Sequence, residues 1–173
     1  ATADAEIDAG ADLLIPGGVE SARVPAVVMA TMTQTEPVVI VGKQPSVEDW
    51  KREVSAIRDA MFRARNLEGW EVVQTIGSPS LAALVGFIAQ ATARRTPVLI
   101  DGPLAATAAV LAERSAPGVK GWLRAGSTSL EPAHALALKE LGLSPLLDLK
   151  LSAGYPLGAL AALPLVQLAA ELS

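Results

Sequence analysis

The chain has no cysteine and only one histidine among its 173 residues. Without thiols it holds neither a disulfide framework nor a thiolate metal site, and one histidine excludes a centre built from several imidazoles. Aromatic residues make up only 3% of the chain, although hydrophobic residues make up 51%. An apolar share made mostly of Ala, Leu and Val favours small-residue helices on a buried sheet over a β-sandwich. We therefore expect neither a metal nor a cofactor.

Long apolar runs are also missing. The longest, at residues 81–93 and 159–170, are shorter than the roughly 18 to 20 residues that a membrane-spanning helix needs. The formal net charge is −4 and the charges are spread along the chain, so we expect no nucleic-acid surface. The N-terminus lacks an initiator Met and the apolar core of a secretion signal, which indicates a cut end of a longer protein. We expect a cytoplasmic location and no membrane span.

Short apolar runs alternate with longer segments of helical period, which is typical of βαβ units and a mainly parallel sheet. The sequence predicts strands at residues 11–15, 37–41, 96–100, 121–124 and 145–149. It predicts helices at residues 46–65, 80–94, 104–114, 130–141 and 157–172. Length and composition favour a single α/β domain of the doubly wound kind over residues 1–173.

The segment at residues 46–65 has the clearest helical pattern. Apolar residues recur at spacings of three and four, which places on one helix face Val47, Trp50, Val54, Ile57 and Met61. Ser46 is a candidate N-cap because Asp49 follows it by three residues, and Gly142 is a candidate C-cap of a later helix. The tryptophans fall on apolar patterns, so we expect core positions for Trp50, Trp70 and Trp122.

Four polar or glycine-rich segments follow predicted strands, where open parallel sheets bind their ligands. They lie at residues 17–20, 101–103, 126–129 and 153–156. Gly17 and Gly18 match neither the dinucleotide-binding nor the P-loop pattern, which favours an ordinary tight turn. Asp101 is suited equally to orienting a polar ligand group and to capping the helix that follows.

The hydroxyl residues at 127–129 come just before Glu131 and Pro132. This order favours capping of the next helix over contact with a phosphate, although one hydroxyl can do both. His134 has no Ser or Cys nucleophile in evident partnership. A structural or surface role is therefore favoured over a catalytic base.

Several stretches of the chain occur in the order and at the spacing of one known family. They are LVGFIAQA at 84–91, TPVLIDG at 96–102, SLEPAH at 129–134, LGLSPLLDL at 141–149, GA at 158–159 and ALPL at 162–165. On these stretches the chain resembles the nicotinate-nucleotide:dimethylbenzimidazole phosphoribosyltransferase family. The resemblance covers nearly the whole chain and corresponds to about the C-terminal half of the family's protein, so we expect an upstream domain in the parent chain.

The resemblance implies a Rossmann-like parallel sheet, a homodimer, and transfer of the phosphoribosyl group of nicotinate mononucleotide to a nitrogen of dimethylbenzimidazole. In the family, a glutamate in a Gly-Glu-Gly-Thr-Gly-Ala motif removes the azole proton as general base. A glycine-rich loop, a lysine and a serine help to hold the nucleotide. The ligand-binding candidates here are Lys51 and Ser129, which match family contacts, together with Gly17, Gly18, Asp101 and Gly126.

The motifs that carry the chemistry depart from the family's pattern. The catalytic motif is GYPLGA at 154–159, so Tyr155 holds the position of the catalytic glutamate. Tyrosine has an unperturbed pKa of about 10 and is a poor base at neutral pH. The glycine-rich loop has become GGVESARV at 17–24, in which Glu20 would repel a phosphate and Arg23 would attract one. A His-Arg pair is replaced at 127–128, and a Gly-Thr-Gly segment is shortened at 43–45.

Three functions fit this sequence. The first is a phosphoribosyltransferase-like domain that lacks ordinary catalysis and acts as a ligand-binding, regulatory or subunit-interaction module. The second is an active phosphoribosyltransferase that uses nicotinate mononucleotide and a benzimidazole, with Glu20 or Asp101 as substitute base. The third is a structural dimerisation domain whose clefts are filled by Tyr155 and Leu157. Core positions match while functional motifs differ, which favours the first function and a nucleotide or benzimidazole-like ligand.

Overall fold

A three-stranded parallel sheet forms the centre of the computed structural model, which describes residues 2–151 and 156–172. The strands are β1 (Val98–Ile100), β2 (Leu123–Ser129) and β3 (Pro145–Leu151), side by side in that order. Val98 lies opposite Leu123, and Ser127 lies opposite Leu147. The predicted α/β fold with a mainly parallel sheet is therefore confirmed.

Helices surround this sheet. They are α1 (Thr2–Asp8), α2 (Arg23–Thr33), α3 (Pro37–Ile40), α4 (Val47–Ala64), α5 (Trp70–Ile76), α6 (Pro79–Ala93), α7 (Gly102–Ser115), α8 (Pro132–Leu141) and α9 (Leu157–Glu171), with a short 3₁₀ turn at Val119–Trp122. Helix α7 connects β1 to β2, and α8 connects β2 to β3, as parallel pairing requires.

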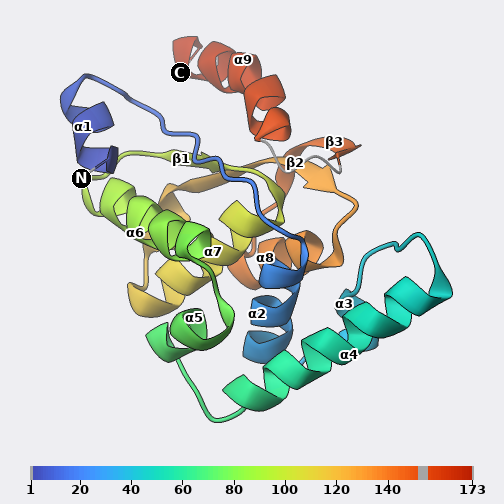
Figure 1. Cartoon of the computed structure of the whole chain (residues 1–173). Coiled ribbons are helices and arrows are strands. Elements are labelled where there is room, and N and C mark those ends of the chain that lie inside the picture. Colours follow the sequence, from blue (N-terminus) through green and yellow to red (C-terminus); the bar gives the residue numbers. More distant parts are fainter. Residues whose placement is uncertain (1, 152–155, 173) are drawn as a thin grey trace.

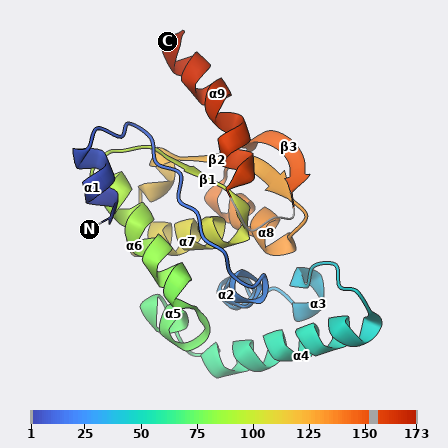
Figure 2. The same cartoon turned by 45° about the horizontal axis from the view of Figure 1, so that its top comes forward.

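The helices form layers on the two faces of the sheet. Figure 1 shows α6, α7 and α8 against one face and α9 against the other. Helix α2 packs on α7 and α8, and α4 packs on α2 as the outermost helix. In Figure 2, α9 stands away from the body, with only its first turns close to the sheet. The strand ends therefore lie between α9 and the inner helix layer.

Two apolar clusters hold these layers together. The larger one joins the buried faces of the helices to the face of the sheet that α6, α7 and α8 cover. It contains Met29, Leu81, Ile88, Ile100 and Leu123. The smaller one lies under α9 and consists of Leu99, Ala159 and Ala162, with Leu13, Ile15, Leu147 and Val166 around them. Leu99 and Ile100 face opposite sides, as alternation along a strand requires. Burial on both faces explains why β1 is a continuous apolar run.

The main helix predictions are confirmed, with ends within one residue for all but α7 and α8. Ser46 caps α4, because its Oγ accepts a hydrogen bond from Asp49 N at 3.1 Å. Gly142 ends α8 with a φ of 67°, a left-handed conformation that glycine adopts without strain. The prediction that one face of α4 points inward is confirmed for Val54 and Ile57, which are buried. Val47, in the first turn, is exposed instead.

Two strand predictions fail. Residues 37–41 form the short helix α3, because Pro37 suits the first turn of a helix and a brief apolar run does not distinguish strand from helix. Residues 11–15 are extended but make only an isolated parallel bridge, between Leu14 and Val98. In addition, α1, α2 and α5 were not predicted from the sequence.

Strand β2 begins two residues later than expected and runs further. It includes residues 126–129, which the sequence had suggested as a loop beyond the strand. The tryptophan prediction is also wrong: Trp70 and Trp122 are 49% and 36% exposed, and Trp50 is half-buried. Small Ala and Val side chains fill the core in their place, which is why few aromatic residues suffice.

Candidate functional site

Asp101 is the polar residue at the centre of the strand ends. It follows β1, and its Oδ2 accepts a hydrogen bond from Gly158 N of α9 at 2.7 Å. Its side chain makes no capping hydrogen bond within α7, so the predicted alternative of capping the next helix is not what the structure shows. The carboxylate instead meets the positive end of α9, where a helix favours an anion. Burial raises the pKa of the Asp101 carboxyl, and hydrogen bonds from backbone N–H groups, including that of Gly158, oppose this rise.

Glycines allow α9 to approach the sheet this closely. A Cβ on Gly158 would lie 2.5 Å from Ser127 Cβ and 2.6 Å from Asp101 Oδ1. A Cβ on Gly126 would lie 2.6 Å from the Ala159 backbone. Gly126, expected as a ligand contact, is thus needed for helix packing. Its contact with a ligand stays a prediction.

A small hollow lies beside Asp101. Among its lining residues are Gly17, Gly18 and Glu20 from the loop before α2, and Pro156 from the start of α9. Its volume is only about 20 Å³. That is room for about one water molecule, whereas small-molecule sites usually enclose about 300 to 1,000 Å³. The Pro156 ring comes within 3.1 Å of where a Gly17 Cβ would lie, so proline fills the space beside the glycine turn.

The charged residues of the glycine-turn loop are engaged within the chain. Arg23 forms a two-pronged ion pair with Glu53, with Nε donating to Oε2 at 2.8 Å and Nη2 donating to Oε1. This pair lowers the pKa of Glu53 and ties α2 to α4. Glu20 accepts a hydrogen bond from the neighbouring Ser21 N. Arg23 is therefore committed to a carboxylate at the place where a phosphate contact was considered.

Ser127 and Thr128 support the neighbouring strand rather than the next helix. Ser127 Oγ accepts from Leu149 N at 3.0 Å, and Thr128 Oγ1 accepts from Lys150 N at 3.1 Å. The pairing between β2 and β3 shifts register here, and Lys150 has a left-handed φ of 51°. The two hydroxyls thus satisfy backbone groups of a β-bulge. The expectation that they cap α8 is wrong.

Ser129 ends β2 and contacts the one histidine. His134 Nδ1 lies 2.8 Å from Ser129 Oγ, which also accepts from Glu131 N at 3.3 Å. His134 is only 1% exposed, and burial lowers its pKa to about 4. Its Nε2 is buried without a partner among the residues described. The structural role that the sequence favoured for His134 agrees with this burial.

Lys51 lies apart from Asp101, exposed in α4. An open hollow of about 540 Å³ lies beside α4. It is lined by Trp50 and by the turn before α4, which includes Val41, Gly42 and Pro45. This turn is close to the start of α8, since a Cβ on Gly42 would lie 2.8 Å from Glu131 Oε2. The segment that follows α3 therefore approaches the turn that follows Ser129.

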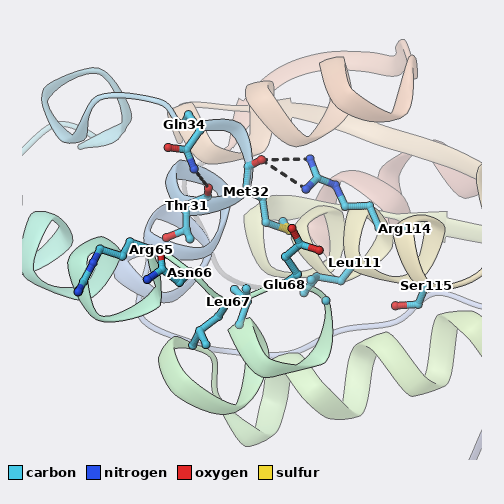
Figure 3. A pocket seen from close by; sticks show the side chains of 12 residues that line it. Thr31, Met32, Gln34, Arg65, Asn66, Leu67, Glu68, Leu111, Arg114 and Ser115 are labelled. Carbon is cyan, nitrogen blue, oxygen red and sulfur yellow. Dashed lines mark hydrogen bonds between the residues drawn. The ribbon is translucent and has the colours of Figure 1, made fainter.

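A more spacious hollow lies elsewhere. It has a volume of about 900 Å³ and is lined at the ends of α2 and α7 and by the turn between α4 and α5. Figure 3 shows Arg114 donating to Met32 O and Gln34 donating to Thr31 O within it. Arg114 and Asp101 lie at opposite ends of α7, which separates them by about 20 Å at the helical rise. This hollow is therefore remote from the strand ends.

The structure brings together only some of the predicted site residues. Gly17, Gly18, Glu20 and Asp101 surround one small hollow, whereas Ser129 pairs with His134 and Lys51 stands on another helix. Tyr155 lies outside the described residues. Sequence reasoning missed both the Ser129–His134 contact and the anchoring of α9 by Asp101. The five-residue spacing from strand end to first helical turn was the available signal for the former.

Neither a metal centre nor a membrane span is found in the part of the chain that the structure describes. No group of three or more His, Cys, Asp or Glu residues there is arranged to hold a metal ion. No helix there is long and apolar enough to cross a membrane.

A parallel sheet covered by helices, with polar strand ends beneath a helix N-terminus, places the chain among the α/β proteins with a parallel sheet. A family model described as Phosphoribosyltransferase matches residues 1–173. The nicotinate-nucleotide–dimethylbenzimidazole phosphoribosyltransferase of Corynebacterium glutamicum (strain ATCC 13032) is 51% identical over 176 residues, which cover 98% of this chain and 49% of the relative. The protein of that name from Mycobacterium avium (strain 104) is 48% identical over 175 residues, with 98% and 50% covered.

Solved structures agree with these relatives. The crystal structure of CobT from Thermus thermophilus is similar with a TM-score of 0.91 and 34% identity, over 98% of this chain and 52% of that chain. The chain belongs to the phosphoribosyltransferase family, as the sequence resemblance indicated. It spans about half the length of the relatives it matches.

Burial of His134 predicts a stability that falls in mild acid. The unfolded imidazole titrates near 6.5 and the folded one near about 4, so between these values the unfolded state binds more protons. The stability contributed is full above pH 6.5 and is lost as the pH falls toward about 4, by on the order of 3 kcal/mol over the whole window. Urea unfolding between pH 7 and 5 measures this slope. His134→Asn should flatten it, and an unchanged slope in that variant would contradict the assignment.

Proposed function

We propose that this chain is a phosphoribosyltransferase-like module that binds ligand and another polypeptide surface but does not carry out ordinary phosphoribosyl transfer. The observation that carries the absence of ordinary transfer is the filled corner at the strand ends. There the Asp101 carboxylate holds Gly158 N, Pro156 covers Gly17, and only about 20 Å³ is open. A nucleotide phosphate does not fit in that volume.

The lack of a base at the usual position supports the same proposal. Deprotonation of the attacking azole needs a proton acceptor whose pKa is near the working pH. Tyr155 holds the family's glutamate position, and a phenol with a pKa of about 10 accepts a proton poorly at neutral pH. Ser127 and Thr128, which replace a His-Arg pair, are hydrogen-bonded to β3. Arg23, near the altered glycine-rich loop, is paired with Glu53.

One observation favours the alternative of an active enzyme. Burial raises the pKa of Asp101, which makes its carboxylate a better proton acceptor than an ordinary aspartate. Glu20 lines the same hollow. In this alternative the substrates are nicotinate mononucleotide and a benzimidazole, and opening of the Pro156 contact admits them. The hydrogen bond from Gly158 weakens the case, because it stabilises the ionised carboxylate and so lowers the pKa of Asp101.

Exposed leucines support the proposed role in subunit contact. Most of helix α9 stands away from the body (Figure 2), and several leucines of this segment are exposed. They include Leu160, Leu165, Leu168 and Leu172, each at least 51% exposed. Apolar groups gathered in this way usually mark a protein contact. The proposed partner is a second copy in a homodimer, and an upstream region of the parent chain is the alternative.

Replacing Tyr155 by glutamate tests whether the base is what is missing. Purified protein is incubated with nicotinate mononucleotide and dimethylbenzimidazole, and chromatography detects the ribazole phosphate. We expect no product from the unaltered protein. With the corner filled, Tyr155→Glu should also yield none. Product from Tyr155→Glu but not from Tyr155→Gln, the uncharged control, would show that only the base is missing and that the corner opens on binding. Product from the unaltered protein would overturn the proposal and favour Asp101 or Glu20 as base.

Charge placed on α9 tests the proposed subunit contact. The double variant Leu165→Glu, Leu168→Glu should convert a dimer to monomer in sedimentation equilibrium, because buried unpaired carboxylates oppose association. Gln167→Glu adds charge to the same helix and serves as the matched control. A dimer that survives the double variant would exclude α9 as the contact.

A further inference from the structure

Ser129 and His134 form a hydrogen-bonded pair that the proposed chemistry does not yet use. Ser129 is half-buried at the end of β2, and its Oγ has two partners among the described residues. One is Glu131 N, which donates to it at 3.3 Å. The other is His134 Nδ1, at 2.8 Å. His134 lies in the first turn of α8 and is 1% exposed.

The surroundings of the imidazole decide which nitrogen carries its proton. A neutral imidazole has one N–H, and the other nitrogen only accepts. Nε2 is buried and has no partner among the described residues. A proton on Nε2 would therefore be a buried donor without an acceptor, an arrangement that folded proteins rarely keep. A proton on Nδ1 is donated to Ser129 Oγ instead.

The state of the imidazole fixes what Ser129 can offer a ligand. A hydroxyl has two acceptor lone pairs and one hydrogen. With Nδ1–H and Glu131 N–H both donating to it, Oγ has its lone pairs occupied and only its hydrogen free. The opposite tautomer would turn that hydrogen toward His134 and leave a lone pair for a ligand donor. The two tautomers thus prefer opposite kinds of ligand atom.

We infer that His134 acts as a positioning residue that makes the Ser129 hydroxyl a dedicated hydrogen-bond donor, so that the ligand atom at Ser129 is an anionic oxygen of a phosphoryl or carboxylate group. This inference rests on the proposed ligand binding and deepens it. The burial that keeps the imidazole neutral also keeps the arrangement in place at physiological pH. His134 itself touches no ligand.

The tautomer is measured directly and without any ligand. His134 is the single histidine of the chain, so the imidazole signals in a long-range ¹H–¹⁵N NMR spectrum have one assignment when the purification tag contains no histidine. The expected spectrum has a protonated Nδ1 and an unprotonated Nε2 at pH 7. A protonated Nε2, or rapid averaging between the two forms, would overturn the inference.

Calorimetric binding of nicotinate mononucleotide measures the consequence for the ligand. Ser129→Ala should weaken binding about 10-fold, which is the lower end of the loss expected when one hydrogen bond to a charged group is removed. His134→Leu should weaken it similarly in the native background and have no further effect in Ser129→Ala. His134→Asn, whose amide N–H₂ takes the place of Nδ1–H, should restore most of the affinity. Ser55→Ala, on the exposed face of α4, is the matched control and should leave binding unchanged.

The outcomes separate this inference from the proposed function. Binding that is unaffected by Ser129→Ala overturns the inference and leaves the ligand role of the chain intact. Additive effects of Ser129→Ala and His134→Leu show that His134 acts independently of Ser129 and also overturn it. If the unaltered protein binds no nicotinate mononucleotide, the proposed ligand role fails, and with it the ligand half of the inference.

Discussion

The hydrogen bond between the Asp101 carboxylate and the Gly158 amide is the interaction on which the arrangement of the strand ends depends. It joins the end of β1 to the first turn of α9 across the edge of the sheet. An anion at a helix N-terminus is stabilised by free N–H groups and by the helix dipole, and here the anion belongs to the protein itself. Small residues on both sides make the contact possible, since neither Gly158 nor Gly126 has room for a Cβ.

This internal anion changes what the edge of the sheet can do. A helix N-terminus at strand ends is ordinarily a place for a phosphate. In this chain the carboxylate takes that place, and Pro156 closes the neighbouring glycine turn. The hydroxyls of Ser127 and Thr128 hold a bulge in β3, and Arg23 holds Glu53. Several groups near the altered family motifs therefore serve the fold, which is the physical basis for proposing binding without ordinary catalysis.

The sequence was informative where one strong local pattern decides the structure. Ser46 and Asp49 indicated the start of α4, and the apolar run through Leu99 indicated a strand buried on both faces. It failed where short apolar segments carry no period: residues 37–41 became a helix that begins at Pro37. The family was also evident from the sequence, because the stretches that match it are core segments whose order the fold requires.

Site geometry was harder to predict because it depends on contacts between distant residues. Nothing local to Asp101 indicates that its carboxylate reaches Gly158, 57 residues away. The same holds for Arg23 and Glu53, 30 residues apart. Ser129 and His134 are close in sequence, yet their pairing depends on the strand-to-helix turn between them. Residue types alone suggested candidates, and only the folded chain assigns their partners.

The most direct test of this account is an NMR pH titration of the Gly158 amide. We expect a strongly deshielded amide proton whose shift follows the ionisation of Asp101 with a midpoint above the ordinary carboxyl value of 3.8. Asp101→Asn should abolish the titration while keeping the fold. An amide proton at an ordinary shift that does not respond to pH would show that the carboxylate does not hold α9, and would contradict the account.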